Sequence, residues 1–197
     1  MIAIQEAYGE LVRALEEMEL PYAVGGSIAS GAYGVSRATQ DVDLVVDLSP
    51  EEAFVLATRL EGSFSVDAGD AREAIGRNRP FNLIHMGTAF KFDIFPATFF
   101  AHGEDEICRR RMVEGTGLVA EGTVPVVSPE DIILAKLAWY RDGGGTSERQ
   151  WRDLESVWEM RSKELDRTYL DSWAVRMGTR ELLRRLEGTV FGSPAGF

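Results

Sequence analysis

The chain has few of the residues that build disulfide, thiolate or imidazole sites, and it has no long apolar run. Its 197 residues include one cysteine, Cys108, and two histidines, His85 and His102. A single cysteine excludes an internal disulfide, and the two histidines lack the spacing of metal ligands. No apolar stretch approaches the length of a transmembrane helix and no secretory leader follows Met1, so we expect a cytoplasmic protein without membrane contact.

Basic charge is also scarce. The chain has 21 Lys and Arg against 32 Asp and Glu, which gives a formal net charge of −11. Proteins that bind along a nucleic acid through phosphate contacts normally present a basic surface. Extended DNA binding is therefore not expected. The small basic groups at 77–79 and 109–111 are interpreted as solvated helix faces, with a local basic patch as the alternative.

The hydrophobic periodicity that is present predicts an α/β (α+β) protein, in which helices flank a mixed sheet. Helices are expected over residues 3–19, 27–33, 50–61 and 70–77. Strands are expected over residues 22–24, 41–47, 64–67, 81–86 and 90–95, with the last two forming a hairpin around Gly87-Thr88. Alternating glycines and valines over residues 103–127 indicate short strands or a β-ribbon.

A composition change near Pro125 indicates a second unit. The sequence Ser128-Pro129-Glu130-Asp131 is a helix start signal, with serine as N-cap and proline at the first helical position. A second helix is expected after Ser147, one or two more over residues 166–187, and a loose tail over 188–197. We therefore expect a core over residues 1–126 and a C-terminal helical subdomain over 127–197.

Three aspartates are the candidate site residues. Asp41 and Asp43 open the strand 41–47 on one face, and Asp93 shares a face with Lys91 in a later strand, because side chains alternate along an extended chain. If the two strands pair, three carboxylates meet. Two such charges 4 Å apart repel by roughly 4 kcal/mol at an effective dielectric near 20, so the cluster requires a cation. Oxygen ligands suit Mg²⁺, and two ions can clamp the attacking and leaving oxygens of an in-line displacement.

Gly25-Gly26-Ser27 lies between a short strand and a helix, and it predicts a phosphate site. A helix N-terminus favours anions through its unpaired N–H groups and its dipole, and glycine lets the backbone approach a ligand closely. Ser27 adds a hydroxyl donor.

Each of these features has a simpler interpretation. A Gly-Gly-Ser turn alone is ordinary turn chemistry, an Asp-x-Asp pair often serves as a loop carboxylate or cap, and Lys91 or a sheet edge could relieve the charge of Asp93. Lys136 interrupts an apolar helix, and its ammonium either reaches water or, with Arg149 and Arg152, enters the cleft between the two units. The combination is more specific than any single feature.

Residues 20–96 resemble the DNA polymerase β-type nucleotidyltransferase superfamily. The shared signature is a glycine followed by Gly or Ser, a short gap, an acidic-x-acidic strand and a third carboxylate on a later strand. Segments 25–34 and 37–41 are also similar to small bacterial members, namely abortive-infection-type toxins and antibiotic nucleotidyltransferases. The rest of the chain matches only loosely.

The resemblance implies a metal-dependent enzyme that moves a nucleoside monophosphate from an NTP to an acceptor hydroxyl and releases pyrophosphate. The implied nucleotide-binding residues are Gly25, Gly26, Ser27, Arg37, Lys136 and Arg149. The implied metal ligands are Asp41, Asp43 and Asp93, holding two Mg²⁺ ions or Mn²⁺ in their place. Asp93 would also take the proton of the attacking hydroxyl.

The resemblance leaves the acceptor open among tRNA, a protein and a small molecule. It also leaves open a toxin–antitoxin role with a cognate partner protein. Two other classes of protein remain as alternatives. One is a non-catalytic binding module, either an antitoxin or a nucleotide sensor, and the other is an unrelated α/β domain in which the carboxylates are structural caps.

Overall fold

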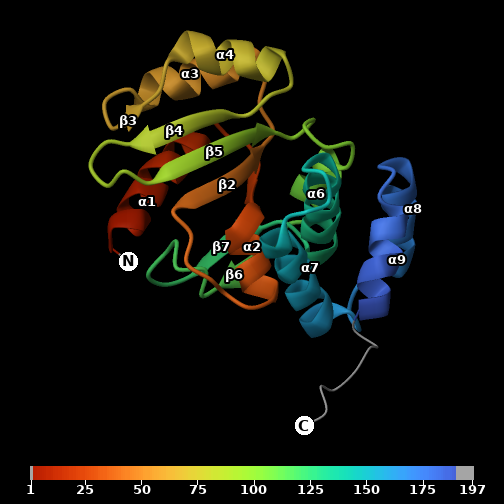
Figure 1. Ribbon diagram of the computed structural model, residues 1–197. Coiled ribbons are helices and arrows are strands. Elements are labelled where there is room, and N and C mark those ends of the chain that lie inside the picture. Colours follow the sequence, from red (N-terminus) through yellow and green to blue (C-terminus); the bar gives the residue numbers. More distant parts are fainter. Residues whose placement is uncertain (1, 190–197) are drawn as a thin grey trace.

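Residues 2–189, the part of the chain that the computed structural model describes, contain a seven-stranded mixed sheet in the order β3-β4-β5-β2-β1-β7-β6 (Figure 1). The strands are β1 (Tyr22–Val24), β2 (Asp41–Val46), β3 (Phe64–Ser65), β4 (Phe81–His85), β5 (Lys91–Pro96), β6 (Arg111–Glu114) and β7 (Thr123–Val126). The pairs β2–β5 and β1–β7 are parallel, and the other neighbours are antiparallel. The expected mixed sheet is confirmed.

The helices are α1 (Ile2–Glu17), α2 (Gly26–Tyr33), α3 (Pro50–Leu60), α4 (Ala68–Gly76), α5 (Gly103–Cys108), α6 (Pro129–Asp142), α7 (Glu148–Arg161), α8 (Arg167–Arg176) and α9 (Arg180–Thr189). In Figure 1, α3 and α4 lie above the sheet and α6 to α9 stand on the right. Helix α2 contacts β2 on one side and α6 and α7 on the other. It therefore links the sheet to the C-terminal helices.

The predicted starts of α3, α6 and α7 are confirmed, whereas α4 begins at Ala68, two residues before its expected start. Ser49 and Glu52 form a capping box at α3: the Ser49 hydroxyl accepts from the Glu52 N–H, and the Glu52 carboxylate accepts from the Ser49 N–H. Ser128 and Ser147 cap α6 and α7 in the same way, through side-chain oxygens that accept N–H groups of the first turn. These local signals fix helix starts because each satisfies a donor that the helix leaves unpaired.

The two faces of the central strands differ in burial. One face belongs to the core, where the side chains of Val42, Leu44, Phe92 and Ile94 are fully buried. Because side chains alternate along β2 and β5, the charged side chains lie on the other face. They are those of Asp41, Asp43, Lys91 and Asp93. The sheet thus carries its charges on the face opposite the core packing of these strands.

The expectation for residues 103–127 is wrong in its first part. Residues 103–108 form α5, whose first turn carries Glu104, Asp105 and Glu106, and acidic side chains suit the positive end of a helix. The second part is confirmed as a β-ribbon, because β6 and β7 pair antiparallel. The expected strand 64–67 is shorter and ends at Ser65.

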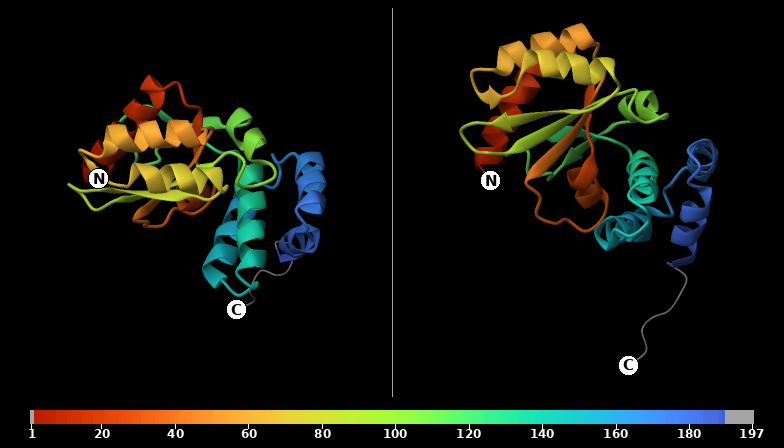
Figure 2. Two further views of the ribbon diagram at one scale, coloured as in Figure 1. Left: turned by 90° about the horizontal axis from the view of Figure 1, so that it is seen from above. Right: turned by 45° about the horizontal axis from the view of Figure 1, so that its top comes forward.

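The C-terminal helices follow the expected boundary at residue 126 and stand to one side of the sheet in both views of Figure 2. Two helices, α8 and α9, fill the segment 166–187 as expected. The tail is expected to begin at residue 188, which is too early because α9 reaches Thr189. Residues 190–197 lie outside the described residues. The division into two domains stays a prediction. No helix within residues 2–189 is both long enough and apolar enough to cross a bilayer.

Candidate active site

A cavity of about 240 Å³ lies against the charged face of β2 and β5. Its wall also includes the first turn of α2 and parts of α6 and α7. The polar lining residues are Gly25, Gly26, Ser27, Arg37, Thr39, Asp41, Asp43, Asp93, Glu106, Lys136, Arg149 and Gln150. All of the implied nucleotide-binding residues and metal ligands therefore line one cavity, while the roles expected of these residues stay predictions.

The carboxylates meet because β2 and β5 are neighbours in parallel register. Asp43 lies opposite Asp93, and Asp41 lies opposite Lys91. Burial of Asp43, followed by the charge of Asp93 and then that of Asp41, raises the pKa of Asp43 to about 6, although Lys136 and Lys91 oppose the shift. The site thus holds a carboxylate whose negative charge is destabilised by its neighbours.

Asp93 uses only one of its two oxygens in a contact with the protein. Its Oδ2 accepts a hydrogen bond from Lys91 Nζ at 2.9 Å, and the same Nζ lies 3.6 Å from Asp41 Oδ1. Its Oδ1 is buried and has no hydrogen-bond partner among residues 2–189. The simple interpretation of Lys91 as a partner of Asp93 therefore describes a real contact, but it leaves one oxygen of Asp93 free for a ligand.

Within the described part of the chain, no group of three or more His, Cys, Asp and Glu side chains is arranged to hold a metal ion. Lys91 lies between Asp41 and Asp93 and contacts both carboxylates. The donors themselves suit a hard divalent cation, because Asp43 faces Asp93 and the buried Oδ1 of Asp93 lacks a partner. Asp43 and Asp93 are the residues that could hold such an ion, with Asp41 as a third donor once Lys91 moves.

The glycine turn is tied directly to the aspartate strand. Gly25 is the N-cap of α2, and its N–H donates to the Asp43 carbonyl at 2.9 Å. Gly26 follows with φ +56°, and a Cβ built on it would come 1.7 Å from Asp43 Oδ2. Only glycine fits there, both for its backbone angle and for the space that the Asp43 carboxylate occupies. Because Gly25 has no side chain to cap the helix, the first N–H groups of α2 are left for a ligand at the cavity wall.

Gly26→Ala is expected to destabilise the protein and disrupt the site. The positive φ alone costs about 1–2 kcal/mol for a residue with a Cβ, and Asp43 must also move. Gly9→Ala is the matched control, because a Cβ at Gly9 in α1 meets nothing within 4 Å, and it is expected to stabilise by about 0.5–1 kcal/mol. Chemical denaturation of both variants measures the difference, and equal stabilities would contradict the argument.

An ion-pair network that the sequence did not predict joins the basic residues of the site. Lys136 Nζ donates to Asp153 at 2.8 Å, and Arg37 Nε donates to the same carboxylate at 3.2 Å. Arg37 also donates to the Ser27 hydroxyl. Burial raises the pKa of Asp153, but the hydrogen bonds from Arg37 and Lys136 outweigh burial and hold it below its ordinary value. One carboxylate on α7 thus orients two cations at the cavity.

Lys136 is 7% exposed and paired with Asp153, so the interpretation in which its ammonium reaches water is wrong. Arg149 is exposed and lines the cavity, and beside it the buried Oε1 of Gln150 has no partner among the described residues. Arg152 does not line the cavity. It lies on the outside of α7 and pairs with Glu148 at 3.6 Å, so its expected position in the cleft is wrong.

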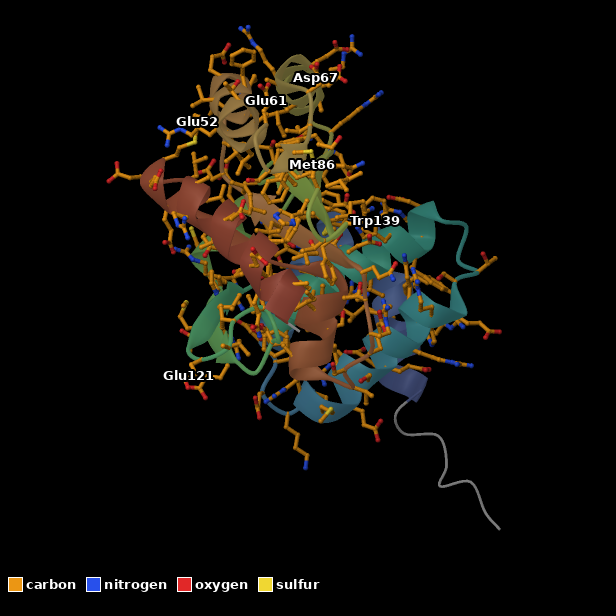
Figure 3. The ribbon with its side chains drawn as sticks, turned by 90° about the vertical axis from the view of Figure 1, so that its left-hand side faces the viewer. Glu52, Glu61, Asp67, Met86, Glu121 and Trp139 are labelled. Atoms are coloured by element: carbon orange, nitrogen blue, oxygen red, sulfur yellow. The ribbon has the colours of Figure 1, made fainter. Side chains whose placement is uncertain are left out.

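An aromatic wall completes the cavity beside Asp93. Phe95 lies two residues after Asp93 on the same face of β5, and its ring packs edge-on to Phe99 and Trp139. Phe99 and Trp139 stack at 5.7 Å with an angle of 26° between their planes. Trp139 is still 40% exposed, and Figure 3 shows it where α6 approaches the sheet. This wall was not predicted from the sequence, although Trp139 follows Lys136 at the three-residue spacing of one helix face.

No family model and no curated protein sequence matches the chain. Solved structures do match its fold. An antigenic nucleotidyltransferase-like protein from Paracoccidioides brasiliensis is 17% identical with a TM-score of 0.57, and the match covers 97% of each chain. The antibiotic-resistance factor ANT(2'')-Ia is 18% identical with a TM-score of 0.52, covering 92% of this chain and 94% of its own.

A second structure of ANT(2'')-Ia, in complex with adenylyl-2''-tobramycin, is 17% identical with a TM-score of 0.52, covering 90% of this chain and 98% of its own. At these identities the likeness concerns the fold. The protein has a nucleotidyltransferase fold over most of its length, which agrees with the resemblance found in residues 20–96.

Proposed function

We propose that the protein is a nucleotidyltransferase, which moves a nucleoside monophosphate from an NTP to an acceptor hydroxyl and releases pyrophosphate. The main support is the register that sets Asp43 beside Asp93, at a cavity that the Gly25–Ser27 turn also lines. The shared fold with ANT(2'')-Ia adds to this support. A module that only binds nucleotides has no evident need for two carboxylates that repel each other.

Backbone N–H groups, a hydroxyl and cationic side chains together bind the triphosphate in this proposal. The N–H groups at the start of α2 and the Ser27 hydroxyl donate to the terminal phosphates, as helix N-termini commonly do for anions. Lys136 and Arg37, oriented by Asp153, balance the phosphate charge, and Arg149, which is exposed at the cavity, adds to it. When bound at Asp43 and Asp93, together with Asp41, Mg²⁺ or Mn²⁺ neutralises phosphate charge and polarises the phosphoryl group.

Asp93 is the general base in this proposal. Its unpartnered Oδ1 accepts the proton of the acceptor hydroxyl as the oxygen forms a bond to the α-phosphorus. The bond from the α-phosphorus to the bridging oxygen breaks, and the electron pair leaves with pyrophosphate. Positioning and charge neutralisation supply most of the rate enhancement in such transfers.

A small molecule is the acceptor class that we propose. The aromatic wall beside Asp93 offers an apolar surface against which a small acceptor can pack. The net charge of −11 disfavours a long polynucleotide. ANT(2'')-Ia, which shares the fold, has been solved with adenylyl-2''-tobramycin. A toxin–antitoxin role, a tRNA acceptor and a cognate partner protein stay predictions of the sequence resemblance.

The decisive experiment combines each of the four NTPs, labelled at the α-phosphate, with Mg²⁺ or Mn²⁺ and with three acceptor pools. These pools are small metabolites and antibiotics, tRNA, and soluble protein. We expect pyrophosphate release together with label in the small-molecule fraction. Label in tRNA would favour the toxin-like role instead. Nucleotide binding without pyrophosphate release would favour the non-catalytic module, and no metal-dependent nucleotide binding would favour structural carboxylates.

A further inference from the structure

Lys91 occupies an unusual position among the charges of the site. Its Nζ lies 2.9 Å from Asp93 Oδ2 and 3.6 Å from Asp41 Oδ1, so one ammonium bridges carboxylates of two adjacent strands. The parallel register accounts for this, because Lys91 lies directly opposite Asp41 and two residues before Asp93 on the same face. A cation shared between two carboxylates is the arrangement that a metal ion would otherwise provide.

The charges of the site show what Lys91 does in the free protein. Asp41, Asp43 and Asp93 bring three negative charges to one face of two strands, and Lys91 offsets one of them. Lys136 is nearby, but its ammonium is hydrogen-bonded to Asp153. Within the described residues, Lys91 is therefore the cation that directly contacts the aspartates.

Lys91 is also free to leave. Its side chain is 36% exposed and that of Asp41 is 53% exposed, so this end of the site is open to solvent. A lysine side chain is a flexible four-carbon stem that rotates at little cost when its contacts are replaced. The inner pair, Asp43 and Asp93, is more enclosed, because the side chain of Asp93 is only 16% exposed.

We propose that Lys91 is an internal counter-cation, which holds the position between Asp41 and Asp93 until a divalent ion arrives with the nucleotide. The inference rests on the proposed function, because it assigns the ion to that site. Ion and ammonium compete for the same carboxylate oxygens. The free protein consequently binds divalent ions weakly, and the triphosphate, which brings its own negative charge, makes displacement of Lys91 favourable.

Titration of Mn²⁺ into the nucleotide-free protein, followed by electron paramagnetic resonance of the unbound ion, tests the competition. Lys91→Met keeps the length of the stem and removes the charge, and we expect it to bind Mn²⁺ about tenfold more tightly or better. Lys91→Arg keeps the charge and is expected to bind no more tightly than the wild type. Lys163→Met removes an equal charge from an exposed position outside the cavity and is expected to match the wild type.

Unchanged or weaker Mn²⁺ binding by Lys91→Met would overturn the proposal, because removal of a competing cation must increase the affinity of the site for Mn²⁺. Thermal unfolding gives a second readout. In EDTA, Lys91→Met is expected to melt below the wild type, and Mn²⁺ is expected to raise its melting temperature more than that of the wild type. A variant that folds only with Mn²⁺ would support the proposal, and one that stays unfolded in saturating Mn²⁺ would contradict it.

Failure of the proposed function would look different. If neither the wild type nor Lys91→Met binds Mn²⁺, with or without each NTP, then the cavity is not a metal-dependent nucleotide site and both proposals fall. If the wild type binds Mn²⁺ with an NTP and releases pyrophosphate, but Lys91→Met binds free Mn²⁺ no better, then only the role of Lys91 is wrong.

Discussion

Asp43→Asn is expected to abolish nucleotidyl transfer and, in the absence of metal, to make the protein more stable. The loss of activity should be on the order of 10³-fold or more, the scale seen when a group that stabilises transition-state charge is removed. The gain in stability follows from the pKa of Asp43, which burial and the charge of Asp93 raise to about 6. Few substitutions in a folded protein are expected to stabilise it while removing its function.

The sign of the stability effect follows from proton linkage. The folded-state pKa of Asp43 lies above the unfolded value of about 3.9, so between the two the folded protein retains a proton that the unfolded chain has lost. The negative charge of Asp43 therefore costs stability as the pH rises through this window. The cost is full above about pH 6 and absent below about pH 4, and Asn removes it. Because Asp43 is half-buried and solvent screens its charge, we expect a gain of about 1 kcal/mol.

Chemical denaturation in EDTA across this pH window measures the effect, and pyrophosphate release in Mg²⁺ measures activity. Asp47→Asn is the matched control, since Asp47 is an exposed carboxylate just beyond the same strand, and it should alter neither quantity. An Asp43→Asn variant that retains turnover would refute the catalytic assignment. A variant that is less stable than the wild type at neutral pH would refute the repulsion between Asp43 and Asp93.

The sequence predicted the local parts of this site because they depend on periods and caps that neighbouring residues determine. Alternation put Asp41 and Asp43 on one face, and the residues around Gly26 indicated a strand-to-helix turn. The sequence did not reveal that β2 and β5 are adjacent and parallel, because pairing between distant segments leaves no local signal. The position of Lys91 opposite Asp41 follows from that register, so its bridging role required the structure.

Two other features were missed for different reasons. Asp153 carries no local signal, because its partner Arg37 is 116 residues away along the chain. By contrast, α5 had a local signal, since three consecutive acidic residues at 104–106 suit a helix start. The pattern of glycines and valines indicates strands only from β6 onward, and α5 precedes it.

Asp153→Ala is expected to weaken nucleotide binding and to destabilise the fold. The substitution leaves Lys136 buried without its partner, and uncompensated buried charges of this kind cost about 3–5 kcal/mol. Arg37 loses the same partner but is 29% exposed, so it can turn toward water. Both cations then lose their fixed direction at the cavity, and we expect affinity for an NTP to fall about tenfold or more. Chemical denaturation and calorimetric titration with the NTP measure the two effects.

The contribution of Asp153 to stability depends on pH in the opposite direction from that of Asp43. The pKa of Asp153 is lowered in the folded state, so its contribution to stability is present above the unfolded pKa of about 3.9. That contribution disappears as the pH falls through the lower folded-state value. The wild type and Asp153→Ala should therefore differ fully at neutral pH and converge in acid. Glu148→Ala, which removes an exposed ion pair on the same helix, should change stability by about 0.5 kcal/mol or less.

A double variant separates the effect on the fold from the effect on the ligand. Lys136→Met combined with Asp153→Leu replaces the buried pair by apolar side chains, which commonly restores stability. If the pair contributes to phosphate binding, the double variant, which lacks the Lys136 charge, should regain most of the lost stability and still bind the NTP weakly. Recovery of both properties would mean that the network serves only the fold. Recovery of stability alone would show that the Lys136–Asp153 pair serves nucleotide binding as well as the fold.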